Sequence, residues 1–421
     1  MKVLILDDDP TGTQSATDAV VLLRWDAERI TDVLRKRDAA YLLTNTRAVD
    51  EEAAVALLES VRDDVRVVER ALGEPVHVVL RGDSTLRGHV FPETEVFAGP
   101  DDVIVFVPAF PQGGRTTRGG EHYVRIEGVE HAARDTEFSK DPVFPFETSY
   151  LPDYVRARTD RLVRPVSLDE VRIGALATIV AEIEPGTVIV PDAVTDDDIR
   201  IISDGVRAAW ATGAHVVVRS GSPLAAALAG VESTGLLRRP LVADPRPTLL
   251  VCGSHTAGAT RQLGAVAERW GAPVEIDTDA AMADAAAEAA RLSSALLESL
   301  RRDAFAAFAS ARDRRDDHDT LAHGEQVMAA LTGAVRAVRA HTPVVVSKGG
   351  ITSADVARVG LGADRAVVVG QVLPGVSVWS LVTPEGVEVL YVVVPGNVGD
   401  SSTIVDVLDA VRAPEPARHA A

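Results

Sequence analysis

Three consecutive carboxylates, Asp7, Asp8 and Asp9, end the short apolar run that opens the chain. Their charges repel one another, so a metal ion, an arginine or a substrate hydroxyl would stabilise them. Residues 10–13, Pro-Thr-Gly-Thr, can turn sharply and present amides and hydroxyls. The alternative is an acidic loop that only ends a strand and caps the next helix. The turn is therefore a candidate for acid or metal chemistry.

The segment 81–88, Arg-Gly-Asp-Ser-Thr-Leu-Arg-Gly, follows the strongest strand pattern in the chain. Arg81 and Arg87 can bind a carboxylate through paired hydrogen bonds, and Ser84 can bind a hydroxyl. Asp83 would then be placed to accept a proton from a sugar hydroxyl. A helix start capped by Asp83 or Ser84 is compatible with this interpretation.

Residues 108–117, Pro-Ala-Phe-Pro-Gln-Gly-Gly-Arg-Thr-Thr, form a segment that neither a helix nor a strand favours. We expect a loop that continues to His122 and Tyr123. Such a loop either shapes a ligand site or is merely irregular. His122 by itself is more typical of a structural histidine.

Three turns in the second half, at 253–256, 347–353 and 395–400, combine glycine with hydroxyl or amide residues after predicted strands. Backbone amides at helix starts bind phosphate groups. The chain contains no Walker A motif, no dinucleotide-binding glycine fingerprint and no HExxH motif. The turns thus indicate phosphate binding without a familiar signature.

Short β-branched runs alternate with helical patterns, which is typical of a mainly parallel sheet. The expected strands of the N-terminal half are 3–6, 41–43, 76–80, 103–107, 187–190 and 216–218, and the expected helices are 51–71, 196–211 and 223–236. Polar segments at 7–13, 44–47, 81–88 and 108–120 each follow a strand. Ligands bind beyond the carboxyl ends of parallel strands, so these segments predict one site.

At 421 residues the chain exceeds the size of one hydrophobic core, and we expect two α/β domains. A Pro- and Arg-rich stretch near 238–247 marks the boundary, which gives domains 1–240 and 247–415. The second domain begins with a strand at 248–252 and has a long helical region at 280–315. Its later strands are expected at 344–347, 366–370 and 389–394.

Composition narrows the classes of function. The net charge of −19 disfavours nucleic-acid and anionic-membrane partners, but a small anionic ligand needs only local arginines. Without an apolar run of membrane-spanning length or a visible leader, we expect a cytoplasmic protein. The single cysteine, Cys252, fits a reducing compartment and is expected to be buried. Assembly into a homo-oligomer is left open.

The acidic turn also fits a haloacid-dehalogenase phosphatase, in which Asp7 would be the nucleophile and Asp9 the acid/base. That alternative needs a later lysine, for which Lys348 is available, and a late acidic pair for magnesium, for which Asp400 and Asp406 are offset from the usual spacing. It leaves the arginine segments unexplained. A nonenzymatic sugar-acid sensor is a third hypothesis, but a sensor does not need a second phosphate-binding half.

Taken together and in order, four segments resemble the four-carbon acid sugar kinase family: 7–14, 83–88, 108–115 and 347–352. The resemblance spans nearly the whole chain. It implies two α/β domains with mainly parallel sheets and an active site in the cleft between them. It also implies phosphorylation of the terminal hydroxyl of a small anionic acid such as threonate, erythronate or 3-oxo-tetronate, with ATP and Mg²⁺.

Carried over by motif, the N-terminal domain would hold the sugar acid through Asp8, Asp9, Arg81, Asp83, Ser84 and Arg87. The C-terminal domain would contact the nucleotide through Ser254, Gly349, Gly350, Thr352, Gly396 and Gly399. Asp83, Asp8 and Asp9 are the candidate catalytic acids, and Lys348 is a candidate for stabilising the transferring group. Which acid would hold a metal stays undetermined.

Two departures from the family pattern matter. Pro10 and Gln14 stand in the first motif, and the segment 81–88 differs from the usual serine- and threonine-rich sequence. The chain therefore resembles a separate branch of the family. Its substrate should not be copied from the well-known members, and a related branched acid is conceivable.

Overall fold

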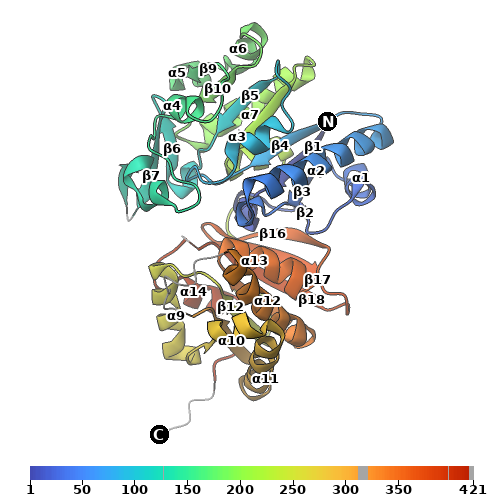
Figure 1. Cartoon of the computed structure of the whole chain (residues 1–421), viewed down its shortest axis with the longest axis vertical. Helices are drawn as coiled ribbons and strands as arrows, with labels where there is room; N and C mark the ends of the chain where they lie inside the picture. Colours follow the sequence, from blue (N-terminus) through green and yellow to red (C-terminus); the bar gives the residue numbers. More distant parts are fainter. Residues whose placement is uncertain (127, 312–320, 397, 417–421) are drawn as a thin grey trace. The chain divides into compact units, whose positions relative to one another are not determined.

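The computed structural model describes residues 1–126, 128–311, 321–396 and 398–416. The chain divides into two compact units, Met1–Ser233 and Thr234–Ala421 (Figure 1). Both are α/β, as the sequence predicted. The segment that follows the division packs on the second unit, where Leu237 N donates to Gln371 O. None of the described helices has the length and apolar character that a bilayer span requires.

A parallel sheet forms the centre of the first unit, with strand order β2-β3-β1-β4-β11-β5-β10-β9. Its strands are β1 (Lys2–Asp7), β2 (Val20–Leu22), β3 (Ala39–Leu43), β4 (Val76–Arg81), β5 (Val103–Val107), β9 (Val163–Val166), β10 (Val188–Pro191) and β11 (Val216–Ser220). All six strands expected in this half are confirmed. Strands β2 and β9, which are short, were missed.

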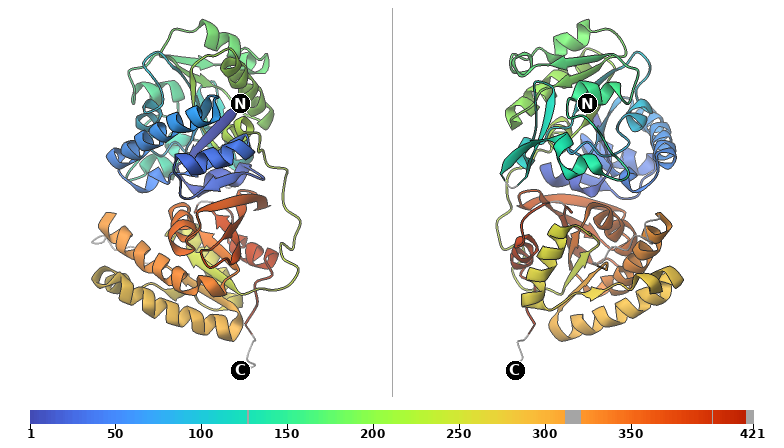
Figure 2. Two further views of the ribbon diagram at one scale, coloured as in Figure 1. Left: turned by 90° about the vertical axis from the view of Figure 1, so that its right-hand side faces the viewer. Right: turned by 60° about the vertical axis from the view of Figure 1, so that its left-hand side comes forward.

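Helices cover both faces of this sheet, which explains why β1 is buried on both sides. They are α1 (Ala27–Lys36), α2 (Glu51–Leu72), α3 (Val90–Glu95), α4 (Leu151–Arg156), α5 (Leu168–Arg172), α6 (Leu176–Glu182), α7 (Asp196–Ala211) and α8 (Ser222–Ala229). Figure 2 shows α1 and α2 (blue) on the opposite side from α7 (yellow-green). Helix α8 ends earlier than expected because Gly230 adopts a left-handed conformation, with φ 69°.

A small antiparallel sheet replaces part of the expected loop at 108–123. It consists of β6 (Arg115–Arg118), β7 (Glu121–Ile126) and β8 (Val129–Ala132). The irregular part ends at Gly114, so the prediction of a loop through Tyr123 was wrong. Gly119 and Gly120 both have positive φ and make the two-residue turn of a hairpin. The polar strand Arg-Thr-Thr-Arg lacks the apolar alternation that would have revealed it.

In the second unit the strand order is β13-β14-β12-β15-β18-β17-β16. The pairs from β13 to β18 are parallel, and β17 is antiparallel to both of its neighbours, β18 and β16. The strands are β12 (Thr248–Cys252), β13 (Val274–Glu275), β14 (Phe305–Ala309), β15 (Val344–Lys348), β16 (Arg365–Leu373), β17 (Val376–Val382) and β18 (Glu388–Val394). The helices are α9 (Ala257–Trp270), α10 (Thr278–Ala283), α11 (Ala285–Asp303), α12 (Leu321–Val338), α13 (Gly350–Asp355) and α14 (Thr403–Ala410). Helices α11 and α12 lie side by side (Figure 2).

The long helix expected at 280–315 was wrong in extent. Helix α11 ends at Asp303, and Ala304 follows in a left-handed conformation, with φ 52°. The next residues, Phe-Ala-Ala-Phe-Ala, form the buried strand β14 between β12 and β13. Alanine favours helices, but burial between two strands decides the conformation here. Residues 312–315 lie outside the described residues.

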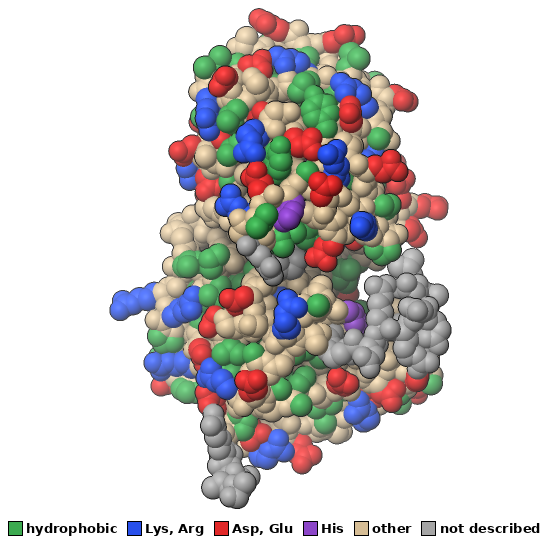
Figure 3. Space-filling model, turned by 90° about the vertical axis from the view of Figure 1, so that its left-hand side faces the viewer, with side chains coloured by type: hydrophobic (Ala, Val, Ile, Leu, Met, Phe, Trp, Pro, Cys, Tyr) green, Lys and Arg blue, Asp and Glu red, His purple; other side chains and the backbone are tan. Residues whose placement is uncertain are grey.

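Acidic and basic side chains are interspersed over the face shown in Figure 3. Surface ion pairs include that of Arg118 with Glu130, at 2.8 Å. Exposed pairs of this kind contribute little to stability. The buried charges of the first unit are a different matter, because they lie at the ends of its central strands.

We predict that Leu58→Ala in α2 lowers the free energy of unfolding by about 2–5 kcal/mol, because the side chain is 1 % exposed and leaves a cavity against the sheet. Urea denaturation measures the loss. Leu57→Ala, the same change at the half-buried neighbouring position, is the matched control and should cost clearly less. Equal losses would contradict the packing described here.

Candidate functional site

The polar segments of the first unit meet at one edge of its central sheet. Strands β3, β1, β4 and β11 are neighbours, and Asp7 lies in register with Leu43 and Arg81, which pairs in turn with Ser220. The segments that follow these strands therefore begin side by side. The structure brings together most of the acids and arginines that the sequence placed in one site.

The acidic turn is buried throughout. Asp7, Asp8 and Asp9 are 0, 1 and 4 % exposed. Asp9 caps the 3-10 turn Pro10–Ser15, and its Oδ1 accepts from Thr11 N at 2.6 Å. A Cβ on Gly12 would lie 2.2 Å from Asp7 Oδ1, so only glycine fits. The alternative interpretation as a cap is thus part of the structure, but it accounts for Asp9 alone.

Arg81 is the central counterion of this turn. Its Nη1 donates to Asp7 Oδ1 at 2.9 Å, to Asp8 Oδ1 at 3.2 Å and to the carbonyl oxygen of Asp9 at 3.1 Å. The side chain is 3 % exposed. Its charge is therefore used within the protein, which favours Arg87 over Arg81 as the partner of a ligand carboxylate.

Arg47, in the 3-10 turn Thr46–Ala48 that follows β3, joins the acidic turn to the segment 81–88. Its guanidinium contacts Asp9 Oδ2 and lies 3.7 Å from Asp8 Oδ2 and 3.3 Å from Asp83 Oδ2. The sequence marked 44–47 as a polar segment but assigned no function to this residue. Its position directly after a buried strand was the signal available.

Asp83 is surrounded by cationic side chains, which make it a strong acid. Burial would raise its pKa, but Arg87, Arg47 and the Thr85 hydroxyl outweigh burial and hold the pKa well below the usual range. Arg87 Nε donates to Asp83 Oδ2 at 2.7 Å. Asp83 is thus ionised at any physiological pH and accepts hydrogen bonds. A carboxylate of such low pKa is a weak general base.

The pKa of Asp7 is shifted in the opposite direction. Burial raises its pKa to about 7, and Asp8 adds to the shift although Arg81 opposes it. Among the described residues, its Oδ2 has no hydrogen-bond partner. A nucleophile must reach its substrate, whereas Asp7 is 0 % exposed and packed against Gly12. This geometry does not support Asp7 as a phosphatase nucleophile.

His122 of β7 anchors the segment 81–88 to the small sheet. It is fully buried, and its Nε2 lies 2.8 Å from the carbonyl oxygen of Ser84. Because that oxygen only accepts, Nε2 carries the hydrogen, and Nδ1 accepts from Thr117 Oγ1 at 3.0 Å. Burial lowers the pKa of His122 to about 4, so the ring is neutral. The structural interpretation of this histidine is consistent with these contacts.

In the second unit, the glycine turns follow three adjacent strands, β12, β15 and β18. Cys252, Lys348 and Val394 end these strands in register. Gly253 N donates to Lys348 O at 3.1 Å, and Gly349 N donates to Val394 O at 2.9 Å. The turns expected to contact a nucleotide therefore lie together at the carboxyl edge of their sheet.

Glycine is required in this cluster of turns by close contacts. A Cβ on Gly253 would lie 2.0 Å from Thr352 Oγ1, and one on Gly399 would lie 2.0 Å from Thr403 Oγ1. Gly349 has φ 114°, and a Cβ there would lie 3.4 Å from Ser254 N. These glycines allow the turns to pack closely, with Gly253 against Thr352 and Gly349 against Ser254.

Lys348 holds one of these turns rather than projecting from them. The residue is 0 % exposed, and its Nζ donates to Pro395 O at 2.7 Å and to Val398 O at 3.2 Å. Burial lowers its pKa to about 8. Its described contacts are those of a residue that orders the turn after β18.

Within the described residues, no group of three or more His, Cys, Asp or Glu side chains is arranged to hold a metal ion. The arginines around the acidic turn occupy the positions that a cation would take. Arg47 and Arg81 already neutralise these carboxylates.

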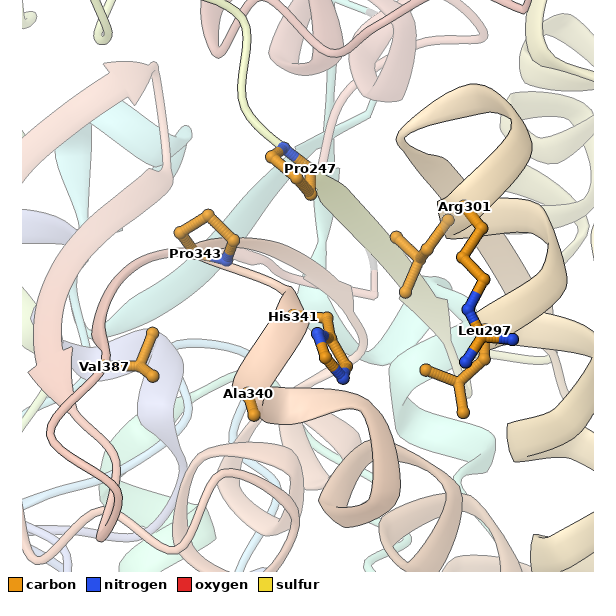
Figure 4. Close-up of a pocket in the computed structure, with 8 residues that line it drawn as sticks. Pro247, Leu297, Arg301, Ala340, His341, Pro343 and Val387 are labelled. Carbon is orange, nitrogen blue, oxygen red and sulfur yellow. The ribbon is translucent and has the colours of Figure 1, made fainter.

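A pocket of about 480 Å³ lies elsewhere in the second unit (Figure 4). Pro247 and Pro343, which line it, precede β12 and β15, so the pocket is at the amino ends of these strands. Arg301 and His341 also line it. It is on the opposite edge of the sheet from the glycine turns and is separate from the expected nucleotide site.

Two enzymes are similar to this chain. The D-erythronate kinase of Heliobacterium modesticaldum is 31 % identical over 278 residues, and the D-threonate kinase of Bordetella bronchiseptica is 28 % identical over 295 residues. The matched parts cover 63 and 66 % of this chain and 60 and 65 % of the relatives. The chain thus matches less than two thirds of either relative's own length.

Domain profiles cover more of the chain. The profile described as "Sugar-binding N-terminal domain" matches residues 3–228, and the one described as "Nucleotide-binding C-terminal domain" matches residues 249–404. The chain belongs to the four-carbon acid sugar kinase family. Family membership confirms the resemblance stated from the sequence motifs. The phosphatase hypothesis has no comparable support.

The fold of this kinase family member is shared with solved structures. A protein from Salmonella typhimurium LT2, described as a putative tRNA synthase, aligns with a TM-score of 0.67 at 19 % identity over 97 % of this chain and 98 % of its own. A Haemophilus influenzae protein of the DUF1537 family aligns with a TM-score of 0.62 at 18 % identity, over 97 and 99 % of the two chains. At these identities the likeness concerns the fold alone.

We predict that His122 makes stability depend on pH. Its folded pKa of about 4 lies below the ordinary value of 6.5, so protonation favours the unfolded chain. The stability from this residue is complete above about pH 6.5 and is lost as the pH falls toward 4. Between pH 7 and 5, wild type should lose roughly 2 kcal/mol more than His122→Gln. Urea denaturation at both pH values measures this difference, and parallel losses in the two proteins would contradict it.

Proposed function

We propose that this protein is an ATP-dependent kinase that phosphorylates the terminal hydroxyl of a four-carbon or closely related sugar acid. The observation that carries the proposal is the cluster formed by Asp8, Asp9, Arg47 and Asp83 at the strand ends of the first unit. This cluster lies in a part of the chain that matches a sugar-binding domain, and the other part matches a nucleotide-binding domain. The two similar enzymes act, by their names, on D-erythronate and D-threonate.

In this proposal Arg87 binds the carboxylate of the acid. Its side chain is 25 % exposed, whereas that of Arg81 is 3 % exposed. Ser84 binds a substrate hydroxyl, and Asp83 accepts the hydrogen of the reacting hydroxyl. Phosphoryl transfer depends mainly on positioning and on charge neutralisation, so a carboxylate of low pKa can orient the hydroxyl without being a strong base. Asp8 and Asp9, which share Arg47 with Asp83, are the other carboxylates of the proposed site.

The nucleotide site is proposed at the glycine turns of the second unit, with Ser254, Gly349, Gly350, Thr352, Gly396 and Gly399 as its contacts. The position of these turns together at the carboxyl ends of β12, β15 and β18 supports this, because backbone amides at such turns can bind phosphate oxygens. Mg²⁺ bound to ATP supplies charge neutralisation at the transferred group. We expect the ion to come with the nucleotide, since in phosphoryl transfer Mg²⁺ binds the phosphate oxygens.

We predict formation of ADP from Mg-ATP that depends on a four- or five-carbon sugar acid, measured with a coupled assay over a panel that includes D-erythronate and D-threonate. Asp83→Asn should lower turnover by roughly 10² or more, because the reacting hydroxyl loses its anionic, charge-assisted acceptor. The exposed Asp135→Asn is the control and should keep wild-type turnover. Phosphate release from sugar phosphates without ATP would instead support the phosphatase.

We predict that Gly349→Ala raises the KM for ATP by about tenfold or more, because φ 114° disfavours a side chain and a Cβ there would lie 3.3 Å from Thr352 Oγ1. The KM for the sugar acid should change little. Gly386→Ala is the control: that glycine also has positive φ, 82°, but no atom lies within 4 Å of a Cβ placed there. A Gly349→Ala enzyme with the wild-type KM for ATP would place the nucleotide elsewhere.

A further inference from the structure

Arg219 lies beneath the candidate sugar-acid site, and no motif pointed to it. It is the fourth residue of β11, and its side chain is 2 % exposed. One arm of the guanidinium, Nη1, forms an ion pair with Glu93 of α3, whose side chain is 3 % exposed. The other arm, Nη2, lies 3.7 Å from Asp8 Oδ2. A single buried arginine thus connects a helix to the acidic turn.

The segment 81–88 packs directly on this arginine. A Cβ on Gly82 would lie 2.6 Å from Arg219 Nη2 and 2.9 Å from its Nε. A Cβ on Gly88, where φ is 121°, would lie 3.3 Å from Asp8 Oδ2 and 3.5 Å from Arg219 Nη2. At both positions of the segment, glycine leaves room for Arg219 and Asp8 that a side chain would occupy.

Two atoms of this contact are unusual for buried groups. Arg219 Nη2 and Asp8 Oδ2 have no hydrogen-bond partner among the residues that the structure describes, and neither has Glu93 Oε1. Buried polar atoms are nearly always hydrogen-bonded in stable cores. Three such atoms in one ion-pair chain indicate an arrangement that serves more than packing.

We infer that Arg219, held by Glu93, is a positioning residue for the sugar-acid site: it orients the Asp8 carboxylate and supports the segment from Gly82 to Gly88. This inference rests on the proposed function. Asp8 is also contacted by Arg81 on Oδ1 and approached by Arg47 on Oδ2, so Arg219 provides the third side of its environment. A guanidinium can contact Glu93 and Asp8 with separate arms, whereas a lysine ammonium is a single point charge.

A purely structural ion pair would give a different result on mutation. Losing one partner of a buried pair destabilises the fold, but it would leave the kinetic constants of the folded enzyme unchanged. A positioning residue changes them selectively. We expect the KM for the sugar acid and kcat to change while the KM for ATP does not, because the nucleotide turns belong to the other unit.

The test compares Arg219→Met, Arg219→Lys and Glu93→Gln with wild type, using the acid of the panel that wild type phosphorylates best. Arg219→Met should lower kcat/KM for the acid by at least about 30-fold, with the KM for ATP within about twofold. Arg219→Lys should recover only part of this loss, and Glu93→Gln should show a smaller loss of the same kind. Thermal unfolding of each variant is recorded in parallel.

Arg161→Met is the matched control. Arg161 is also a mostly buried arginine, with 10 % exposure, and it pairs with Glu95 on the same helix α3 at 2.6 Å, away from the acidic turn. It should lose stability but keep the wild-type kinetic constants. If Arg161→Met showed the same kinetic loss as Arg219→Met, displacement of α3 would explain both, and the inference would be overturned.

The remaining outcomes are also decisive. Folded Arg219→Met with wild-type kcat and KM would overturn the positioning role while leaving the proposed function intact. If Arg219→Met does not fold, Arg219→Lys and Glu93→Gln decide by the same kinetic criterion. Absence of acid-dependent turnover in wild type itself would overturn the proposed function, and with it this inference.

Discussion

The first unit buries several carboxylates at one sheet edge and compensates them with buried arginines. An ionised carboxylate removed from water without a partner costs several kcal/mol, and Asp7, Asp8 and Asp9 are almost fully buried. Arg81 contacts all three, and Arg47 contacts the last two. The three acids lie at the end of β1, Arg81 ends β4, and Arg47 lies in the segment after β3. The strand order that places β3, β1 and β4 side by side is therefore a condition for burying the acids.

The site shifts the pKa values of two aspartates in opposite directions. Asp7 lies deepest, where burial raises its pKa to about 7, whereas Arg87, Arg47 and Thr85 keep Asp83 ionised. Such divergence of neighbouring carboxyl groups is common where proteins handle protons and charged ligands. The ionised member belongs to the more exposed segment 81–88. Asp7, the member with the raised pKa, packs against Gly12 at the start of the turn.

In the second unit, as in the first, the turns of interest follow adjacent parallel strands. Its strand ends carry mainly glycine and hydroxyl residues. The exception is Lys348, which donates hydrogen bonds to Pro395 O and Val398 O and so orders the turn after β18. The result is an edge of closely packed glycine turns. The pocket at the opposite edge is lined by Arg301 and His341 together with prolines and aliphatic residues (Figure 4).

The sequence by itself determined the class of fold, most strands and the family, because buried β-branched runs and the ordered motifs are local features. It also placed Asp8, Asp9, Arg81 and Asp83 near one another, since residues after parallel strands share an edge. The sequence could not show that Ala304 would end a helix and that alanines 306 and 307 would lie in a strand, because neighbouring strands decided their conformation.

Only the tertiary structure decided which charges pair. Arg81 has the sequence context of a ligand-binding arginine, yet its guanidinium is enclosed by the acidic turn. Arg47 and Arg219 carry no motif, and they become part of the site because β3 and β11 flank the strands that hold the acids. Ion pairing depends on distances of a few ångströms between residues far apart in the chain, and no pattern of spacing contains that information.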